Sequence, residues 1–215
     1  MGELLRVSEV FLSIQGESTR AGLPCAMVRL AGCNLRCAWC DTKYAWDAGQ
    51  PRTVRQVLDE VAALCCRRVE VTGGEPLLQP AALELLRGLC EAGFETLLET
   101  NGTCDLSGVD GRVVRIVDVK CPSSGEGGSF RRENLDLLTG RDEVKFVLAD
   151  RGDFDFAAGF VRRHDLTGCC AVIFSPVAGR LAPATLAEWI LAEGLDVRLG
   201  VQLHKVIWPD AARGR

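Results

Sequence analysis

Three cysteines lie within eight positions of this 215-residue chain, in the stretch AGCNLRCAWCDTKYAWD. Cys33, Cys37 and Cys40 follow the pattern C-x3-C-x2-C. A closed zinc site takes four Cys or His ligands, whereas three thiolates leave one iron of a cubane cluster open to a substrate or cofactor. The triplet therefore predicts an iron–sulfur centre with an open position. A zinc or iron–sulfur binding module remains the alternative, because Cys25 or a more distant cysteine could supply a fourth ligand.

A glycine-rich motif, TGGEP, occupies residues 72–76 at the end of the β-branched run VEVT. Glycines let the backbone approach a ligand and present its amides and carbonyls without obstruction. The same residues are also typical of an ordinary β-turn. Together with the cysteine triplet, the motif indicates part of a ligand site.

Strands and helices alternate along most of the chain, which indicates an α/β fold. Strand-forming runs occupy residues 7–13, 26–32, 69–72, 95–100, 113–120, 143–149, 170–176 and 196–204. Helical spacing predicts helices over 53–66, 80–93, about 153–164 and 183–194, and Thr53 and Gln56 are placed as a capping box for the first. This order predicts a largely parallel sheet with helices outside and chemistry at the carboxyl ends of its strands.

The chain is too short for a complete eight-fold β/α barrel, which usually needs about 250 residues. The connection over residues 101–112 also lacks room for a crossover helix. We therefore expect an incomplete, open, TIM-like β/α barrel, formed by one domain over residues 1–215. The segment SSGEGGS (123–129) is typical of a mobile loop.

The composition argues against nucleic-acid and membrane partners. The formal net charge is -4, and charges of both signs are mixed without a long block of one sign. Glu3, Arg6 and Glu9 interrupt any signal-peptide core, and no run of about 18 apolar residues follows. We therefore expect a cytoplasmic protein that binds a small molecule. Its thiols should be reduced, with the eight cysteines outside the triplet serving as small buried hydrophobic residues.

The triplet on a loop after a strand, with Trp39 just before its last cysteine, resembles the radical S-adenosylmethionine superfamily, and TGGEP is similar to that superfamily's glycine-rich segment. The resemblance implies a partial β/α barrel and a [4Fe–4S] cluster whose open iron binds the amino and carboxylate groups of S-adenosylmethionine. It also implies reductive cleavage of that cofactor to methionine and a 5′-deoxyadenosyl radical, which abstracts hydrogen from a substrate.

Further motifs resemble one family of this superfamily, the 7-carboxy-7-deazaguanine synthases. They are FLSIQGES (11–18), VRLAGCNLRCAWCDTKYAWD (28–47), VTGGEPLLQ (71–79), LETNG (98–102), DVKCPSSG (118–125), EVKFV (143–147), FSPV (174–177) and QLHKVIW (202–208). The resemblance implies a Mg²⁺-dependent radical ring contraction of 6-carboxy-5,6,7,8-tetrahydropterin to 7-carboxy-7-deazaguanine. Ammonia is lost, and the product leads to queuosine and related 7-deazapurines.

The resemblance assigns a pterin site and a magnesium site. Positions that match the family's pterin contacts are Ile14, Gln15, Gly16, Glu17, Arg29, Thr72 and His204. Backbone groups of residues 14–16 suit the edge of a pterin, and the Arg29 guanidinium suits a bidentate contact with the substrate carboxylate. Thr42 matches the hydroxyl that binds Mg²⁺. Structural roles stay open: Arg29 could pair with a nearby acid, Glu17 and Thr42 could belong to turns, and His204 could be structural.

A second set of positions matches contacts to S-adenosylmethionine. They are Trp39, Cys40, Asp41, Gly74, Glu99, Lys120, Pro122, Ser123 and Ser124. Gly74 matches the contact to the amino group, and residues 122–124 fall where the family reaches the ribose or carboxylate side. Glu99 could instead cap a neighbouring strand, and Lys120 could pair with Asp118.

The resemblance also implies partners. They are the pterin, an external electron donor such as flavodoxin, and a second copy of the chain in a homodimer. It implies no catalytic side chain beyond the cluster and cofactor. A radical-forming activase acting on a protein that carries a glycyl radical remains the alternative, because such enzymes share the cysteine triplet and a similar length. The segments QGE and QLHK, with Arg29, favour a small-molecule pocket.

Overall fold

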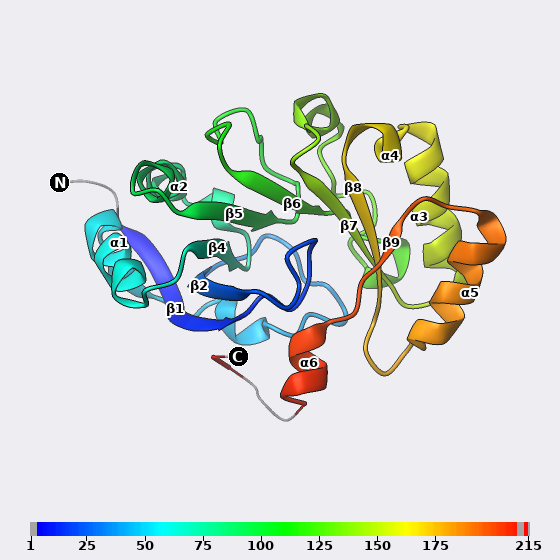
Figure 1. The fold of residues 1–215 in the computed structure, drawn as a ribbon, viewed down its shortest axis with the longest axis horizontal. Helices are drawn as coiled ribbons and strands as arrows, with labels where there is room; N and C mark the ends of the chain where they lie inside the picture. The colour runs from blue at the N-terminus through cyan, green and yellow to red at the C-terminus, as the bar shows by residue number, and fades with distance from the viewer. Residues whose placement is uncertain (1–3, 210–212, 215) are drawn as a thin grey trace.

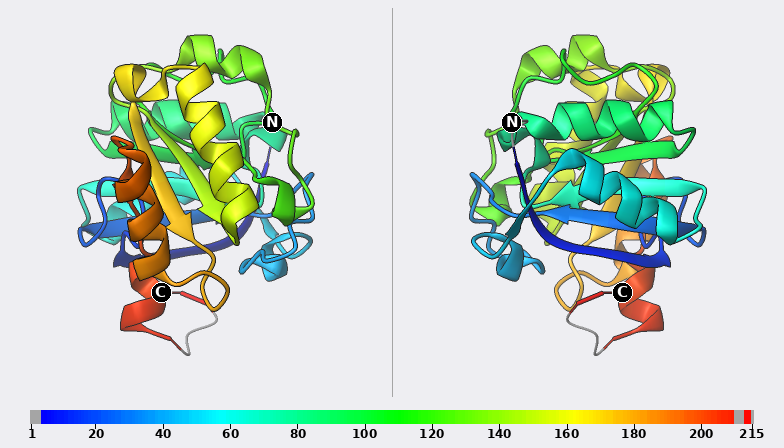
Figure 2. Two further views of the ribbon diagram at one scale, coloured as in Figure 1. Left: turned by 90° about the vertical axis from the view of Figure 1, so that its right-hand side faces the viewer. Right: turned by 90° about the vertical axis from the view of Figure 1, so that its left-hand side faces the viewer.

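The computed structural model describes residues 4–209 and 213–214, and within them nine strands form one curved sheet with helices on its outer face (Figures 1 and 2). The strands are β1 Leu5–Ile14, β2 Pro24–Leu30, β3 Gln50–Arg52, β4 Arg68–Gly73, β5 Glu95–Thr100, β6 Val114–Asp118, β7 Glu143–Leu148, β8 Ala171–Pro176 and β9 Arg198–Leu199. The α-helices are α1 Val54–Ala63, α2 Ala81–Glu91, α3 Arg151–Arg163, α4 Leu166–Cys169, α5 Pro183–Glu193 and α6 Leu203–Ile207.

The order of strands across the sheet is β3-β1-β2-β4-β5-β6-β7-β8-β9. From β2 to β9 every neighbouring pair is parallel, whereas β1 is antiparallel to both β2 and β3. The two edge strands do not pair with each other within the described residues, so the barrel is open. This confirms the predicted incomplete β/α barrel. The connection from β5 to β6 contains no α-helix, as its length predicted.

Local sequence explains the first helix. Thr53 accepts a hydrogen bond from the Gln56 amide through its side chain, and the Gln56 side chain accepts one from the Thr53 amide at 2.8 Å, so the predicted capping box is present. Val54, Val57 and Val61 then recur on the buried side of α1. The helix is therefore fixed both by its cap and by its apolar face.

Alternation along the strands separates an apolar outer face from a polar interior. In β4, Val69 and Val71 belong to the hydrophobic core, whereas Glu70 and Thr72 line the interior cavity. On the outer face of the sheet, aromatic rings pack edge to face. The ring centroids of Phe146 and Phe174 are 5.5 Å apart. The sheet can therefore hold polar residues inside because its helices bury the other face.

The last predicted strand is mostly wrong. Of residues 196–204 only Arg198–Leu199 are in a strand, and α6 begins at Leu203. An edge strand with one neighbour gains few ladder hydrogen bonds, and the apolar residues Leu203, Val206 and Ile207 have helical spacing. The short strand β3 was not predicted.

The segment 123–129 is a loop whose first two residues belong to a 3₁₀ turn over Pro122–Ser124, in which the buried Ser124 hydroxyl donates to the Cys121 carbonyl at 2.6 Å. Its mobility stays a prediction. The expectation that the eight cysteines outside the triplet are buried holds only for Cys25, Cys121 and Cys170. Cys65 is exposed just after the end of α1, with a left-handed φ of 51°, and the other four are partly buried: Cys66, Cys90, Cys104 and Cys169. No helix within residues 4–209 and 213–214 has the length and apolarity to cross a membrane.

Candidate active site

A cavity of about 600 Å³ occupies the interior of the sheet. Its mouth lies at the carboxyl ends of the parallel strands, where the cysteine loop follows β2. Its deep end is closed by the loop after β1, because Ile14 at the end of β1 pairs with Pro24 at the start of β2. All residues predicted for the site line this cavity except Pro122, Ser123 and Ser124.

The cysteine loop is held at the mouth by backbone hydrogen bonds. The Gly32 amide donates to Ala45 at 2.8 Å, and the Ala38 amide donates to Ser124 at 2.9 Å. Cys33, Cys37 and Cys40 are half-buried, free of disulfides and all face the cavity. Burial raises the pKa of the Cys33 and Cys37 thiols, while Lys120 acts to lower that of Cys37. The site thus gathers three thiols beside a lysine.

Gly74 brings the glycine-rich motif into direct contact with the cysteine loop. A Cβ atom at this position would lie 2.2 Å from the Gly32 carbonyl oxygen and 2.7 Å from the Cys33 Cβ. The next residue, Glu75, is fully buried and accepts hydrogen bonds from the Asn101 amide at 2.7 Å and the Thr100 hydroxyl at 2.9 Å. The motif is therefore more than a β-turn, since it ties the ends of β2, β4 and β5 together.

Substitution of Gly74 by alanine should separate these segments. The contacts are with backbone, which cannot rotate away, so we expect a loss of about 1–3 kcal/mol in the free energy of unfolding. We also expect S-adenosylmethionine affinity to fall about tenfold or more. Urea denaturation and equilibrium dialysis measure these effects. Gly111→Ala is the matched control, because a Cβ there would have no atom within 4 Å. Unchanged affinity in Gly74→Ala would contradict the tight approach.

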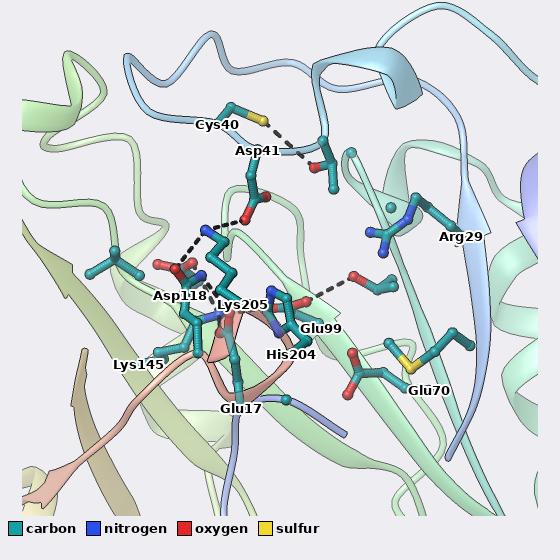
Figure 3. A pocket seen from close by; sticks show the side chains of 18 of the residues that line it. Glu17, Arg29, Cys40, Asp41, Glu70, Glu99, Asp118, Lys145, His204 and Lys205 are labelled. Atoms are coloured by element: carbon teal, nitrogen blue, oxygen red, sulfur yellow. Dashed lines mark hydrogen bonds and ion pairs between the residues drawn. The ribbon is translucent and has the colours of Figure 1, made fainter. Parts of the chain in front are cut away.

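Glu17, Glu99, Asp118 and Lys145 form an interior charge cluster (Figure 3). The Lys145 ammonium lies 2.5 Å from oxygens of Glu17 and Glu99 and 3.6 Å from Asp118, and its side chain is 4% exposed. Burial acts to raise the pKa of Glu99, but Lys145 and a hydrogen bond from the Thr72 hydroxyl lower it to about 2. Burial acts to lower the pKa of Lys145, but Glu17 and Glu99 raise it well above its usual range. Both shifts favour the charged forms of Glu99 and Lys145.

Arg29 projects into the cavity and is also paired with an acid. Its Nε atom lies 2.8 Å from Glu9, whose carboxylate accepts the Tyr44 hydroxyl at 2.6 Å. Arg29 therefore forms the ion pair with a nearby acid that the sequence left as an alternative, and it also lines the cavity, as predicted. Burial raises the pKa of Tyr44 to about 12, so its hydroxyl stays a donor to Glu9. Because Nε takes the Glu9 bond, the terminal nitrogens remain for an anion.

The carboxyl-terminal helix completes the wall. Its His204 packs on Gly16, where a Cβ would fall 2.1 Å from the imidazole Nδ1. Lys205 pairs with Asp41 at 2.7 Å, and the Leu203 amide donates to the Gly16 carbonyl at 2.8 Å. These contacts join α6 both to the cysteine loop and to the loop after β1. Thr42 lines the cavity with its hydroxyl 3.6 Å from the Cys40 sulfur.

The segment at residues 122–124 contacts the site indirectly. Ser123 donates through its amide to Asp153 at 3.0 Å and through its hydroxyl to Asp150 at 3.1 Å, and Ser124 supports the cysteine loop through Ala38. Their contact to the cofactor stays a prediction. Lys120 pairs with Asp118 at 2.9 Å, which is the alternative left open for it, and it still lines the cavity.

Several cavity residues were not predicted for the site. Titratable ones among them include Tyr44, Glu70, Asp118, Lys145 and Lys205. Asp118 and Lys145 stand in the quoted motifs DVK and EVKFV, so a signal for them existed. For Glu70 the signal was weaker: an acid in an otherwise apolar strand, two residues before Thr72.

Fold and cavity agree with one class of protein. Residues 27–160 match the family model described as the Radical SAM superfamily, which covers more than half of the chain. A crystal structure of QueE from Escherichia coli superimposes with a TM-score of 0.79 and covers 94% of this chain and 95% of that chain, at 23% sequence identity, which supports the same fold. The class is therefore radical S-adenosylmethionine enzymes with an open β/α barrel.

Two relatives narrow this class. A 7-carboxy-7-deazaguanine synthase of Koribacter versatilis is 47% identical over 225 residues, covering 98% of this chain and 100% of the relative. One of Chlorobaculum tepidum is 46% identical over 213 residues, covering 98% and 97%. The chain belongs to the 7-carboxy-7-deazaguanine synthase family. Membership implies a [4Fe–4S] cluster and S-adenosylmethionine as cofactors.

The residues of the cavity fit these cofactors. Three free thiols on one loop are the ligand set of a cluster with one open iron, and the Gly73–Gly74 segment beside them exposes backbone to the same space. No three His, Cys, Asp or Glu side chains among the described residues are grouped to hold a single metal ion.

Proposed function

We propose that this chain converts 6-carboxy-5,6,7,8-tetrahydropterin to 7-carboxy-7-deazaguanine with loss of ammonia, as a radical S-adenosylmethionine lyase on the route to queuosine and related 7-deazapurines. The observation that carries the proposal is one cavity that joins three cluster-type thiols to a polar interior large enough for cofactor and substrate. The full-length similarity to relatives named as synthases of this product supports it.

In this proposal the mouth of the cavity serves the cofactors. Cys33, Cys37 and Cys40 hold the cluster, which with S-adenosylmethionine supplies a 5′-deoxyadenosyl radical when both are bound. Residues 39–41, Gly74, Glu99 and Lys120 bind S-adenosylmethionine, with residues 122–124 on its ribose or carboxylate side. The close contact of Gly74 with Gly32 and Cys33 supports this division, because it places backbone amides directly beside the thiols.

The deeper part of the cavity holds the pterin. Arg29 contacts the substrate carboxylate through its terminal nitrogens, and Thr72 and His204 contact the ring. Residues 14–16 line its edge, although the Gln15 amide and carbonyl are already bonded to Leu23 and Gly22 at 2.8 and 2.9 Å. A carbonyl oxygen can accept a second hydrogen bond, so acceptors remain there. The interior charge cluster fixes this region through its ion pairs, with Glu17 as its link to the loop.

Thr42 holds Mg²⁺ in this scheme, and the cation orients and polarises the substrate carboxylate. We expect Thr42→Ala to raise the Mg²⁺ concentration for half-maximal turnover about tenfold while iron content stays unchanged. Thr42→Ser keeps the hydroxyl and should restore the wild-type dependence. Turnover titrated with Mg²⁺ at constant cluster loading measures this. An unchanged dependence in Thr42→Ala would remove Thr42 from the magnesium site.

The reaction is tested by anaerobic reconstitution with iron and sulfide, followed by incubation with reductant, S-adenosylmethionine, Mg²⁺ and the carboxytetrahydropterin. Chromatography should detect 7-carboxy-7-deazaguanine. If 5′-deoxyadenosine forms without deazaguanine, the substrate is wrong. Formation of a glycyl radical on a protein partner would support the activase alternative, which the family membership and the enclosed cavity disfavour.

We further propose that an external electron donor such as flavodoxin reduces the cluster, and that the chain is a single cytoplasmic domain that forms a homodimer. Lys43 and Arg180 support an acidic donor. Both are exposed, lie 5.9 and 5.5 Å from the ring centroids of Trp46 and Trp39, and have no ion pair within the described residues.

A further inference from the structure

Glu70 is a buried acid that the proposed reaction has not used. It lies in the middle of β4 with 2% of its surface exposed, and its side chain points into the cavity (Figure 3). Thr72, two residues further along the strand, lines the same cavity. The strand neighbours of Glu70, which are Val69 and Val71, point the other way, into the hydrophobic core. An ionisable side chain in such a place needs hydrogen-bonding partners, because an unpaired buried charge is costly.

The sheet register places Glu70 below the expected position of the substrate carboxylate. In the parallel pair of β2 and β4, Arg29 is opposite Thr72, and Met27 is opposite Glu70. The two levels are therefore two residues apart, or about 6.6 Å along the strands. That separation is comparable to the length of a fused bicyclic ring. A ligand whose carboxylate contacts Arg29 thus directs its far edge toward the level of Glu70 and the loop after β1.

The carboxylate of Glu70 is only partly satisfied by the protein. Within the described residues it accepts one side-chain hydrogen bond, from the Gln15 amide nitrogen Nε2 to Oε2. The other end of that amide is also fixed, since Gln15 Oε1 accepts from the Glu17 backbone amide at 2.7 Å. Glu70 is therefore oriented, while Oε1 has no hydrogen-bond donor among these residues. Burial, and next the charge of Glu99, raise the pKa of Glu70 well above its usual range, so N–H donors from a ligand are needed to favour its charged form.

We propose that Glu70 determines specificity by accepting hydrogen bonds from the adjacent ring N–H and exocyclic amino group of a 2-amino-4-oxo heterocycle bound in the cavity. This inference rests on the proposed pterin substrate. Two neighbouring N–H donors match a carboxylate in the same way as a guanidinium does. The Gln15 carbonyl already accepts from Gly22 and can offer only one further lone pair, so a side chain is needed to accept from two neighbouring donors. Gln15 holds that side chain in place.

Binding of 6-carboxypterin, the fluorescent oxidised form of the substrate, tests the inference directly. The reconstituted protein with S-adenosylmethionine and Mg²⁺ is equilibrated by dialysis, and the free pterin is measured by fluorescence. We expect Glu70→Gln to weaken binding about 10- to 100-fold, the effect of losing hydrogen bonds to a charged acceptor. The variant retains an oxygen that can accept from Gln15, so the loop is still held. Glu84→Gln, an exposed change on α2, is the control. Binding by Glu70→Gln within twofold of wild type would overturn the inference.

The analogue of 6-carboxypterin that lacks the 2-amino group tests whether Glu70 recognises that group or only positions other parts of the site. Wild type should bind this analogue about 10- to 100-fold more weakly than 6-carboxypterin, whereas Glu70→Gln should bind the two with similar affinity. If both proteins lose the same factor on removal of the amino group, Glu70 does not read it, and the inference fails. Urea denaturation of Glu70→Ala measures how much the hydrogen bond between Gln15 and Glu70 contributes to the free energy of unfolding.

The two proposals can fail separately. One outcome is that wild type makes no deazaguanine while Glu70→Gln still binds 6-carboxypterin more weakly than wild type does. In that case the proposed reaction is wrong and the proposed recognition by Glu70 stands. If wild type makes deazaguanine while Glu70→Gln binds and discriminates like wild type, the reaction stands and the role of Glu70 is wrong.

Discussion

Replacement of Lys145 by methionine is expected to lower the free energy of unfolding by about 3–5 kcal/mol. Its side chain is 4% exposed and pairs with Glu17, Glu99 and Asp118, so removal leaves three acids without the cation at their centre. Methionine keeps much of the volume, which isolates the effect of charge. Urea denaturation at matched iron content measures the change. Lys205→Met is the control, because the Lys205 and Asp41 side chains are 33% and 45% exposed and their pair should be worth about 1 kcal/mol or less.

The pH dependence gives this prediction a second readout. The pKa of Glu99 is depressed from 4.5 to about 2 in the folded state, so its contribution to stability is present above about pH 4.5 and is lost as pH falls through about 2. Lys145 is a main cause of that depression. The stability difference between wild type and Lys145→Met should therefore shrink between pH 7 and pH 3. A difference that stays constant over this range would show that lost packing, and not charge, causes the destabilisation.

Local signals in the sequence predicted most of the framework. The capping box at Thr53, the helical spacing of the valines that follow, and the alternation of strands with helices depend on residues close together in the chain. The cysteine triplet and TGGEP predicted which loops meet at the mouth, since the carboxyl ends of parallel strands share one edge. The site could be predicted where chemistry is concentrated in a short motif.

Long-range pairing could not be predicted in the same way. Lys145 and Glu17 are 128 positions apart, and their contact depends on sheet register and on the path of the loop after β1. The role of Glu70 could not be predicted for the same reason. Only its register with Met27 and its hydrogen bond from Gln15 show that it faces the cavity. The prediction of a strand over residues 196–204 was wrong because the local residue pattern carries no information that the sheet ends there.

The two ends of the cavity carry different chemistry as a result. Thiols, glycines and the hydroxyl of Thr42 lie at the mouth, while the carboxylates of Glu17 and Glu70 lie deeper. Arg29 is between them, fixed by Glu9 and Tyr44. A substrate with an anionic group at one end and N–H donors at the other is complementary to this order.

Substitution of Cys37 by alanine is expected to abolish activity and cluster binding, because two thiolates cannot replace the three that hold a cubane with one open iron. Reconstituted wild type should contain about four irons per chain, and Cys37→Ala should retain little iron after desalting. Cys104→Ala is the matched control: it is a partly buried thiol outside the cavity lining, so its iron content should equal that of wild type.

The absorbance of the cluster and metal analysis give readouts that do not depend on turnover. Folding is expected to persist in Cys37→Ala, since this half-buried side chain faces the cavity and lies outside the hydrophobic core. Circular dichroism should therefore match that of wild type. One zinc per chain in anaerobically prepared wild type, or full iron content in Cys37→Ala, would contradict the assignment of the triplet. Loss of iron with the fold retained would instead locate the cluster on this loop, next to Gly74 and at the mouth of the pterin cavity.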